Sequence, residues 1–281
     1  MINMNKVKIF VCSHKPVDNI LRNDVYKPLH LERVNSPYKN EMKEYEGDDT
    51  GENISERGAY YSEGTGIYWI WKNVNDCEYV GLTQYRRQFN CTFTSENIDS
   101  YFNDGTDVVM SRPILRPKGR FFTVLTYMQM EDFLILRGVI KKISPEYLTT
   151  LNQYLRSYSD RPFNMVVCKK ELYDKYAEWM FSICLEMEKY IRYSGYLNSK
   201  RLFGYVTELL TPIFFIHNKC KIKSMDVLLG GKMINQSWKN RLAMWILDNT
   251  IGKWRKDIPV YIDPSFYRGL KADGIDLDCT Y

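Results

Sequence analysis

The sequence has no long hydrophobic run, little excess charge and no cysteine pair with a metal-binding spacing. No window approaches the roughly 20 apolar residues of a membrane-spanning helix. The 39 basic and 34 acidic residues give a net charge of +5, which is too mild to indicate nucleic-acid binding by itself but is compatible with an anionic ligand or a membrane surface. The seven cysteines form an odd set without a CxxC pair, so we interpret them as reduced core thiols rather than as disulfide partners or zinc ligands.

No secretion signal is expected at the N-terminus. Its apolar run, from Val7 to Cys12, is short and is not followed by a small-residue cleavage site. We therefore expect the protein to be made and kept in the cytoplasm. A disordered chain is excluded, because 44% hydrophobic and 15% aromatic residues provide enough apolar material for one sizeable core and a smaller appendage.

Hydrophobic patterns predict strands and helices in alternation, which is typical of an α/β fold. The expected strands are residues 6–12, 78–82, 107–111, 164–168 and 213–216. The expected helices are residues 63–74, 171–191, 202–210, 232–254 and, with a break at Ser144-Pro145, 121–158. The polar segment 31–62 is expected to form a long loop, and loops of that length are commonly functional or disordered.

The most informative segment is a buried strand that runs into two arginines. It spans Glu78–Phe89 and has the sequence EYVGLTQYRRQF. In a nucleotide-binding α/β fold, ligands bind at the carboxyl ends of central strands. Adjacent side chains in a strand-then-turn context point in different directions, so one of Arg86 and Arg87 is expected to point inward, where it needs an anion. Two surface salt bridges are the alternative interpretation.

A second polar cluster lies in the long loop. Residues Gly47–Ser55 have the sequence GDDTGENIS, whose glycines allow close backbone approach to a ligand and whose Asn53 can bind a base or ribose edge. A surface loop with a calcium-like acid cluster, or a helix cap, is the alternative. The nearby Tyr68 and Trp69 suit stacking on a uracil ring or a sugar face, and they suit a hydrophobic core equally well.

Six motifs occur in a fixed order and together resemble one protein family. The first strand and its SHK ending are followed by GDDTGENIS, GTGIYWIWKN, GLTQYRR, FNMVVCKKELYDKYAEWMF and RLFGYVTELL, over Lys6 to Lys219. In this order they resemble the bacterial domain of unknown function found in glycosyltransferases of capsular and exopolysaccharide synthesis. The resemblance implies a GT-A-like (Rossmann-like) mixed sheet flanked by helices. The implied glycosyltransferase domain comprises residues 1–222, and a C-terminal helical appendage comprises residues 223–281.

The resemblance also implies the reaction and the residues that bind its substrates. The implied reaction transfers galactose, or galactofuranose in some relatives, from a UDP-sugar to a lipid-linked capsular, exopolysaccharide or O-antigen acceptor. The expected donor-binding residues are Ser13, His14, Asp49, Asn53, Ile54, Glu63, Thr65, Tyr68, Trp69, Lys72, Tyr85, Arg86 and Arg87. The expected acceptor or sugar pocket consists of Glu131, Phe163, Asn164 and Met165. A non-catalytic nucleotide- or carbohydrate-binding protein of polysaccharide assembly is the alternative.

No metal ligand is expected from the sequence. GT-A enzymes usually place two aspartates at this strand end to hold a divalent cation that neutralises the diphosphate leaving group. Arginines stand there in this chain, and a guanidinium pair can supply the same stabilisation. We therefore expect that no cofactor is required, with Mn²⁺ or Mg²⁺ left open. Gln84 stands where the family usually has a histidine, a difference that alters specificity if this position contacts donor or acceptor.

Two acids are candidates for the catalytic base. Inverting sugar transfer needs a group that takes the proton of the acceptor hydroxyl. Glu208 lies in an otherwise apolar helix, and Asp132 lies in YMQMEDF, where relatives tend to carry a histidine ahead of the acids. A salt bridge to Arg201 is the alternative role of Glu208, and a helix cap or surface acid is the alternative role of Asp132.

The C-terminal segment combines tryptophans with basic residues. Residues 232–254 are expected to form a helix with basic side chains around one face, and that face carries Ile234, Trp238, Leu242, Trp245, Ile246 and Asn249. This pattern is typical of an interfacial membrane helix, which would bring the enzyme to the inner face of the plasma membrane as a peripheral protein. Packing against the catalytic domain is an equally good interpretation. No nucleic-acid partner is expected, since no such motif occurs.

Overall fold

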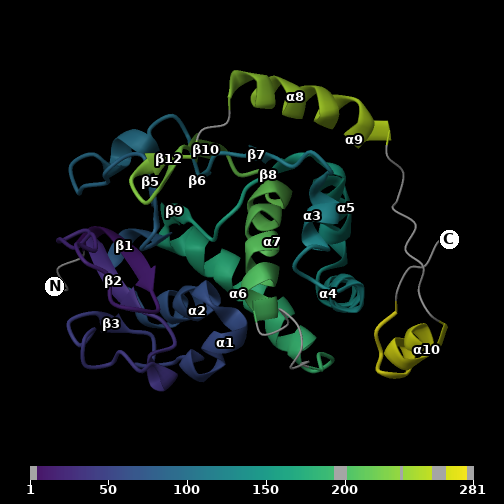
Figure 1. The fold of residues 1–281 in the computed structure, drawn as a ribbon, viewed down its shortest axis with the longest axis horizontal. Coiled ribbons are helices and arrows are strands. Elements are labelled where there is room, and N and C mark those ends of the chain that lie inside the picture. The colour runs from purple at the N-terminus through teal and green to yellow at the C-terminus, as the bar shows by residue number, and fades with distance from the viewer. Residues whose placement is uncertain (1–4, 193–200, 235–236, 255–263, 277–281) are drawn as a thin grey trace. The chain divides into compact units, whose positions relative to one another are not determined.

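The computed structural model describes residues 5–192, 201–234, 237–254 and 264–276 (Figure 1). The chain forms two compact units, each assembled from separate stretches. The first consists of residues 1–113, 161–178 and 203–235, and the second of residues 114–160, 179–202 and 236–281. The predicted boundary between residues 222 and 223 falls inside a strand, and the division into a catalytic domain and an appendage stays a prediction.

A mixed sheet forms the centre of the first unit, which confirms the predicted α/β class (Figure 1). Neighbouring strands β3, β2, β1 and β4 are parallel, β9 runs antiparallel between β4 and β6, and β10 pairs in parallel with β6. Their bounds are β1 (Asn5–Ser13), β2 (Tyr26–His30), β3 (Glu46–Gly47), β4 (Cys77–Gln84), β6 (Val108–Ser111), β9 (Val166–Lys169) and β10 (Ile222–Met225). The short strands β5 (Arg87–Phe89), β11 (Val227–Leu229) and β12 (Lys232–Met233) extend the sheet from the end of β4.

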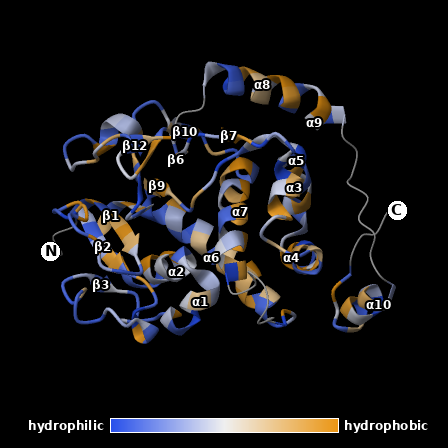
Figure 2. Cartoon of the chain, viewed as in Figure 1, coloured by the Kyte–Doolittle hydropathy of each residue, from blue (hydrophilic) through white to orange (hydrophobic). Residues whose placement is uncertain are grey.

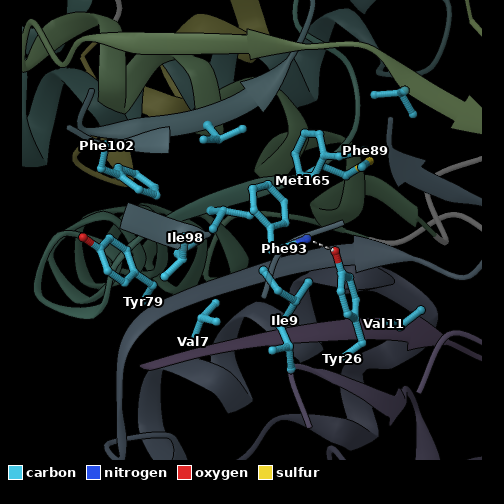
Figure 3. Packing of buried hydrophobic residues seen from close by; sticks show 14 residues of the cluster. Val7, Ile9, Val11, Tyr26, Tyr79, Phe89, Phe93, Ile98, Phe102 and Met165 are labelled. Carbon is cyan, nitrogen blue, oxygen red and sulfur yellow. Dashed lines mark hydrogen bonds between the residues drawn. The ribbon is translucent and has the colours of Figure 1, made fainter. Parts of the chain in front are cut away.

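Alternate side chains of β1 form one wall of a buried core (Figure 3). Val7, Ile9 and Val11 lie on one face of the strand because successive side chains point to opposite faces. The hydroxyl of Tyr26 accepts a hydrogen bond from the backbone N–H of Phe93 at 3.0 Å, which ties β2 to the segment after β5. The same cluster contains Tyr79, Phe89, Ile98, Phe102 and Met165.

Helices α2 (Glu63–Asn73), α6 (Lys170–Glu188) and α7 (Leu202–His217) accompany the sheet. The hydroxyl of Tyr173 in α6 donates to the carbonyl of Ile67 in α2 at 3.4 Å, and Tyr176 in α6 hydrogen-bonds the hydroxyl of Thr211 in α7 at 2.7 Å. These contacts join the three helices through α6. The predicted helices 63–74 and 171–191 are confirmed to within a few residues.

The predicted strand at residues 213–216 is wrong, because these residues continue α7 through Pro212. Proline lacks a backbone N–H, so the hydrogen bond to the carbonyl of Glu208 is lost. The hydroxyl of Thr211 donates to the carbonyl of Thr207 at 2.7 Å, and the surrounding apolar residues are buried. A short apolar run fits a buried helix as well as a buried strand, and here packing on several sides stabilises the helix.

The long loop at residues 31–62 is confirmed as largely irregular, with short elements inside it. These are β3, two 3₁₀ turns at Arg33–Asn35 and Ser55–Arg57, and the single-turn helix α1 (Gly58–Tyr61). The fully buried carboxylate of Asp48 organises the loop. It accepts hydrogen bonds from the backbone N–H groups of Glu32 at 2.9 Å and Arg33 at 3.1 Å, and from the hydroxyl of Ser55 at 2.6 Å.

The second unit is mainly helical. Its helices are α3 (Arg120–Val124), α4 (Met130–Ile143), α5 (Leu148–Arg156), α8 (Trp238–Asn249), α9 (Ile251–Trp254) and α10 (Pro264–Ala272), and β7 (Ile114–Leu115) pairs with β8 (Ser159–Asp160). The fully buried Asp160 carboxylate forms ion pairs with Arg120 Nε at 3.1 Å and with Arg116 Nη2 at 2.6 Å. It also accepts a hydrogen bond from the hydroxyl of Tyr154 at 3.1 Å. Two arginines thus neutralise the buried acid, which meets the requirement that a buried charge be paired.

The continuous helix predicted at residues 232–254 is also wrong. Residues 232–233 form β12, and α8 begins only at Trp238. The hydroxyl of Ser237 accepts the backbone N–H of Asn240 at 3.2 Å, which is a helix N-cap and fixes the start of α8. The helix ends at Asn249, and α9 adds one further turn.

Candidate functional site

The carboxyl ends of β1 and β4 lie side by side in the first unit. The two strands are parallel neighbours, with Cys12 opposite Gln84, and the N–H of Tyr85 donates to the carbonyl of Cys12 at 2.9 Å. The polar residues that follow each strand therefore meet at one edge of the sheet. We call this the carboxyl edge, and it is where ligands bind in open α/β sheets.

The start of α2 lies at the same edge. This helix leads into β4, so it runs against the strand direction and begins beside the end of β1. A Cβ added to Gly66 would lie 3.1 Å from Cys12 Sγ, so the helix and the strand end approach closely. Burial raises the pKa of the Cys12 thiol well above its usual value, and the carboxylates of Glu63 and Asp48 raise it further. Glu63, the first residue of α2, is thus close to the end of β1.

Three basic side chains surround the ring of Tyr85. His14 packs edge-on against it with ring centroids 5.7 Å apart, Lys15 Nζ lies 6.0 Å from its centroid, and Arg86 Cζ lies 5.1 Å from it. His14, Lys15 and Arg86 are exposed. We call these four residues the Tyr85 cluster. It presents positive charge to solvent at the carboxyl edge, as an anion-binding site requires.

Buried Ser13 shapes the turn that carries two members of the Tyr85 cluster. Its hydroxyl donates to the carbonyl of Lys15 at 2.6 Å and accepts the N–H of Lys15 at 3.4 Å. Both bonds stay within the turn, and they hold His14 and Lys15 at the end of β1. Ser13 therefore positions basic residues rather than presenting its own hydroxyl to solvent.

Arg86 and Arg87 differ in their surroundings. Arg86 is exposed at the tip of the β4–β5 hairpin, whereas Arg87 is half-buried. Arg87 Nη1 donates to Gln84 Oε1 at 2.5 Å, and its Cζ lies 4.4 Å from the ring centroid of Phe163. A guanidinium over an aromatic face makes a cation–π contact. Arg87 thus joins the end of β4 to the segment before β9, while Arg86 remains available to a ligand.

The three adjacent pocket candidates before β9 have different environments. Phe163 is partly exposed and has φ +71°, a strained conformation for a bulky residue that is commonest at functional sites. Asn164 is buried; its Nδ2 donates to Thr207 Oγ1 at 3.1 Å, and its Oδ1 accepts from Thr211 Oγ1 at 3.1 Å. Met165 is fully buried in the core. Phe163 alone is able to contact a ligand without rearrangement.

The first part of α7 lies against the start of α2. A Cβ added to Gly204 would lie 3.2 Å from Ser62 Oγ, and one added to Gly64 would lie 3.4 Å from Thr207 Cγ2. Ser62 has φ +49°, a second strained non-glycine residue at this edge. Glu208 follows Thr207 and is partly exposed, so its carboxylate belongs to the helix that borders the carboxyl edge.

Four predicted donor-binding residues of α2 make contacts within the protein. The buried Thr65 hydroxyl donates to the carbonyl of Ser62 at 3.1 Å. Trp69 Nε1 donates to Thr50 Oγ1 at 2.9 Å, and Glu52 Oε1 accepts from Tyr68 at 2.8 Å and pairs with Lys72 at 3.2 Å. Lys72 lies roughly 13 Å along the helix axis from Glu63. Lys72 therefore lies toward the other end of α2 from the carboxyl edge, and donor-binding roles for Thr65, Tyr68, Trp69 and Lys72 stay predictions.

The predicted donor-binding residues of the long loop lie mostly in local contacts. Asp49 pairs with Arg33 at 3.5 Å, and Asn53 Nδ2 donates to the carbonyl of Gly51 at 3.0 Å. Ile54 is buried. These contacts stabilise the loop itself, and a role in donor binding stays a prediction.

Comparison with known proteins assigns the chain to a family. The family model described as Domain of unknown function (DUF4422) matches residues 8–219, which is most of the chain. The chain belongs to this family. The match includes every residue of the Tyr85 cluster, together with Arg87, Phe163 and Glu208. No curated protein matches the sequence.

The fold of this DUF4422 member matches that of a glycosyltransferase. The apo structure of WbbM, a bifunctional glycosyltransferase, is similar with a TM-score of 0.71 and 26% sequence identity, over 83% of this chain and 48% of that one. The chain thus spans about half the length of WbbM. Core-mannan synthase A (CmsA/Ktr4) from Aspergillus fumigatus, in a form with Mn and GDP, has 10% identity over 63% of this chain and 48% of that one, and a TM-score of 0.26, too low to support an argument.

Asp132 and Glu131 lie outside the first unit. Both belong to the first turn of α4 in the second unit. Burial raises the pKa of Asp132 to about 6, and the charge of Glu131 adds to the shift. A carboxyl group with a pKa in this range is suited to proton transfer near neutral pH. The chemistry of Asp132 fits a base, and its catalytic role in this DUF4422 member stays a prediction.

Sequence reasoning missed Lys15 and the structural role of Asp48. Lys15 follows His14 at the end of β1. It could have been found from the sequence, because the residues that follow neighbouring parallel strands meet at one edge of the sheet. Asp48 has the same sequence context as Asp49, and only the fold distinguishes the fully buried acid from the partly exposed one. Among the described residues, no group of three or more His, Cys, Asp or Glu is arranged to hold a metal ion.

Proposed function

We propose that this DUF4422 member is a glycosyltransferase that uses a UDP-sugar as donor. The observation that carries the proposal is the Tyr85 cluster, which gathers His14, Lys15 and Arg86 at the carboxyl edge beside the start of α2. The edge combines exposed positive charge with the N-terminus of a helix, and both attract a diphosphate. The similarity to WbbM over most of the chain supports sugar transfer as the reaction.

In the proposed reaction the hydroxyl oxygen of the acceptor attacks the anomeric carbon of the donor sugar. The bond between that carbon and the oxygen of the β-phosphate breaks, UDP leaves, and the hydroxyl proton passes to a base. Arg86 and Lys15 stabilise the negative charge that develops on the leaving diphosphate. Arg87 holds Gln84 and Phe163 in place, with Phe163 as a stacking face for the sugar or base.

Glu208 is our candidate for the base in the first unit, and Asp132 is the candidate in the second. Glu208 is partly exposed on α7, which borders the carboxyl edge through the contact between Gly64 and Thr207. The donor sugar is proposed to be galactose or galactofuranose, and the acceptor a lipid-linked oligosaccharide of a capsular, exopolysaccharide or O-antigen pathway. These specificities rest on the family resemblance of the six motifs.

Arg86 and Lys15 are proposed to neutralise the diphosphate without a divalent cation. Exposed Arg86, and Lys15 on the neighbouring strand end, approach the same ring from two segments, so both can contact one bound anion. Mn²⁺ or Mg²⁺ would add charge neutralisation if the donor carries it into the site.

The proposal is tested by measuring UDP release from UDP-galactopyranose, UDP-galactofuranose and UDP-glucose, with and without lipid-linked oligosaccharides extracted from bacterial membranes. We expect UDP release from a galactose donor, and we expect the rate of release to rise when acceptor is added. In Arg86→Ala the rate should fall at least tenfold, because the variant loses one charge-assisted contact of about 1.5–3 kcal/mol. Arg22→Ala, which removes an exposed arginine elsewhere, is the matched control. UDP binding without release from any donor would favour the non-catalytic binding protein.

A further inference from the structure

Helix α8 in the second unit has hydrophobic residues along its length (Figure 2), and these residues differ in how far they are exposed. One face is packed. Ala243, Met244 and Leu247 are partly buried, and Asp248 Oδ1 accepts the backbone N–H of Tyr158 at 2.5 Å. This inner face accounts for the attachment of α8 to its own unit. The apolar residues on the opposite face require a different explanation.

The outer face of α8 consists of large, exposed hydrophobic side chains. The exposed fractions are 65% for Trp238, 47% for Leu242, 63% for Trp245 and 44% for Ile246. With about 100° of rotation per residue, these four side chains occupy an arc of about 100°. We call them the α8 stripe. Isolated exposed hydrophobic residues are ordinary, but a contiguous stripe with two tryptophans marks an interaction surface.

Basic residues border the α8 stripe on both sides. By the same rotation, Lys239 falls about 20° beyond Ile246 and Arg241 about 40° before Trp245. Lys253 and Trp254, which is 85% exposed, follow in α9. The sequence of α8 and α9 contains one acid, Asp248, and its carboxylate is engaged on the inner face. The outer face thus combines apolar and positively charged groups without an exposed acid of its own.

We propose that the α8 stripe binds the surface of a bilayer that contains anionic lipids. Tryptophan suits the boundary between headgroups and acyl chains because its ring is apolar and its N–H is polar. Lys239 and Arg241 then contact lipid phosphates on either side of the helix. The length of α8, 12 residues or roughly 18 Å, is too short to cross the hydrocarbon core, so the helix lies in the plane of the interface.

The charge pattern favours a membrane over a second copy of the chain. Two copies that paired through the α8 stripe would bring the basic borders of both helices together, and like charges across an interface are unfavourable. An anionic bilayer offers apolar depth and negative charge at once. No helix in the described part of the chain is both long and apolar enough to span a membrane. The proposal goes beyond the proposed function, because it does not require that the chain transfer sugar.

The test is co-flotation of the full-length chain with vesicles of pure phosphatidylcholine and with vesicles that also contain phosphatidylglycerol. We expect the wild type to bind the anionic vesicles and to be released by salt. The double variant Trp238→Ala/Trp245→Ala should lose at least about tenfold in partitioning, because each exposed tryptophan buries a large apolar area in the interface. Lys239→Glu/Arg241→Glu should remove the preference for phosphatidylglycerol.

Matched controls come from the same unit. Phe122→Ala removes an aromatic ring that is 45% exposed outside α8, and Lys118→Glu reverses an exposed charge. Both should bind vesicles as the wild type does, and circular dichroism should show that every variant keeps its helices. Failure of the wild type to bind anionic vesicles would overturn the proposal. So would a wild-type dimer in gel filtration that the double tryptophan variant converts to a monomer, since the stripe would then join two copies.

Discussion

Replacing Arg86 and Arg87 one at a time separates ligand binding from folding at the carboxyl edge. Arg86 is exposed, and its guanidinium lies beside the Tyr85 ring at 5.1 Å. Surface substitutions of this kind change stability by about 0.5 kcal/mol or less. If Arg86 contacts the diphosphate, Arg86→Ala removes a charge-assisted interaction of about 1.5–3 kcal/mol, which weakens UDP binding by roughly 10- to 150-fold.

Replacing Arg87, unlike replacing Arg86, is expected to lower the stability of the fold. Its side chain donates to Gln84 Oε1 at 2.5 Å and lies 4.4 Å from the Phe163 ring centroid, in a half-buried position. A hydrogen bond from a charged group contributes about 1.5–3 kcal/mol, and a cation–π contact adds about 0.5–1 kcal/mol. Arg87→Ala should therefore lower the free energy of unfolding by about 2–4 kcal/mol and also weaken UDP binding, since it releases Phe163.

The assay combines urea unfolding with calorimetric titration of UDP. Arg22→Ala, an exposed arginine with a 3.9 Å contact to Glu44, controls for the loss of one positive charge. The reasoning is refuted if Arg86→Ala binds UDP as tightly as Arg22→Ala does. It is refuted as well if Arg87→Ala unfolds at the same urea concentration as the wild type.

Three further predictions follow from individual contacts. Burial raises the pKa of Asp132 to about 6, so the folded wild-type protein loses stability as the pH rises from 3.8 to 6. Asp132→Asn should therefore unfold at a higher temperature than the wild type above pH 6 and at the same temperature below pH 3.8, which melting curves measured against pH check. Asn164→Ala should lower the free energy of unfolding in urea by about 2 kcal/mol, because it leaves two buried threonine hydroxyls of α7 without their amide partner, while Asn164→Gln controls for the amide. Lys72→Met should leave UDP affinity in calorimetry unchanged, because Lys72 pairs with Glu52 away from the carboxyl edge; a tenfold loss would restore it to the donor site.

The strands β1, β4, β6 and β9 and the main helices of the first unit were predictable because their hydrophobic patterns are strong, whereas β2, β3 and β10 were not predicted. β1, β4 and α6 follow the expected ranges within a few residues. The helical structure of the residues after Pro212 was not predictable. A continuous apolar run shows neither a helical nor a strand period, and the buried surroundings that stabilise α7 exist only after folding. The start of α8 is set by the Ser237 cap. The apolar pattern continues upstream of Ser237, so it predicted a helix that begins too early.

The candidate site was predictable only at strand ends. His14, Tyr85 and Arg86 follow two strands whose parallel pairing brings them together. By contrast, neighbours within one motif separate in the structure: Lys72 lies toward the far end of α2 from Glu63. Position along a helix, rather than membership of a motif, decides which side chains reach the carboxyl edge.

The central claim is that the carboxyl edge of the first unit binds a nucleoside diphosphate through its own basic residues. The most direct measurement is calorimetric titration of the wild type with UDP, once in excess EDTA and once with Mn²⁺. We predict binding in both buffers, because exposed Arg86 and Lys15 carry the neutralising charge. Binding that occurs only with Mn²⁺, or in neither buffer, would contradict the account.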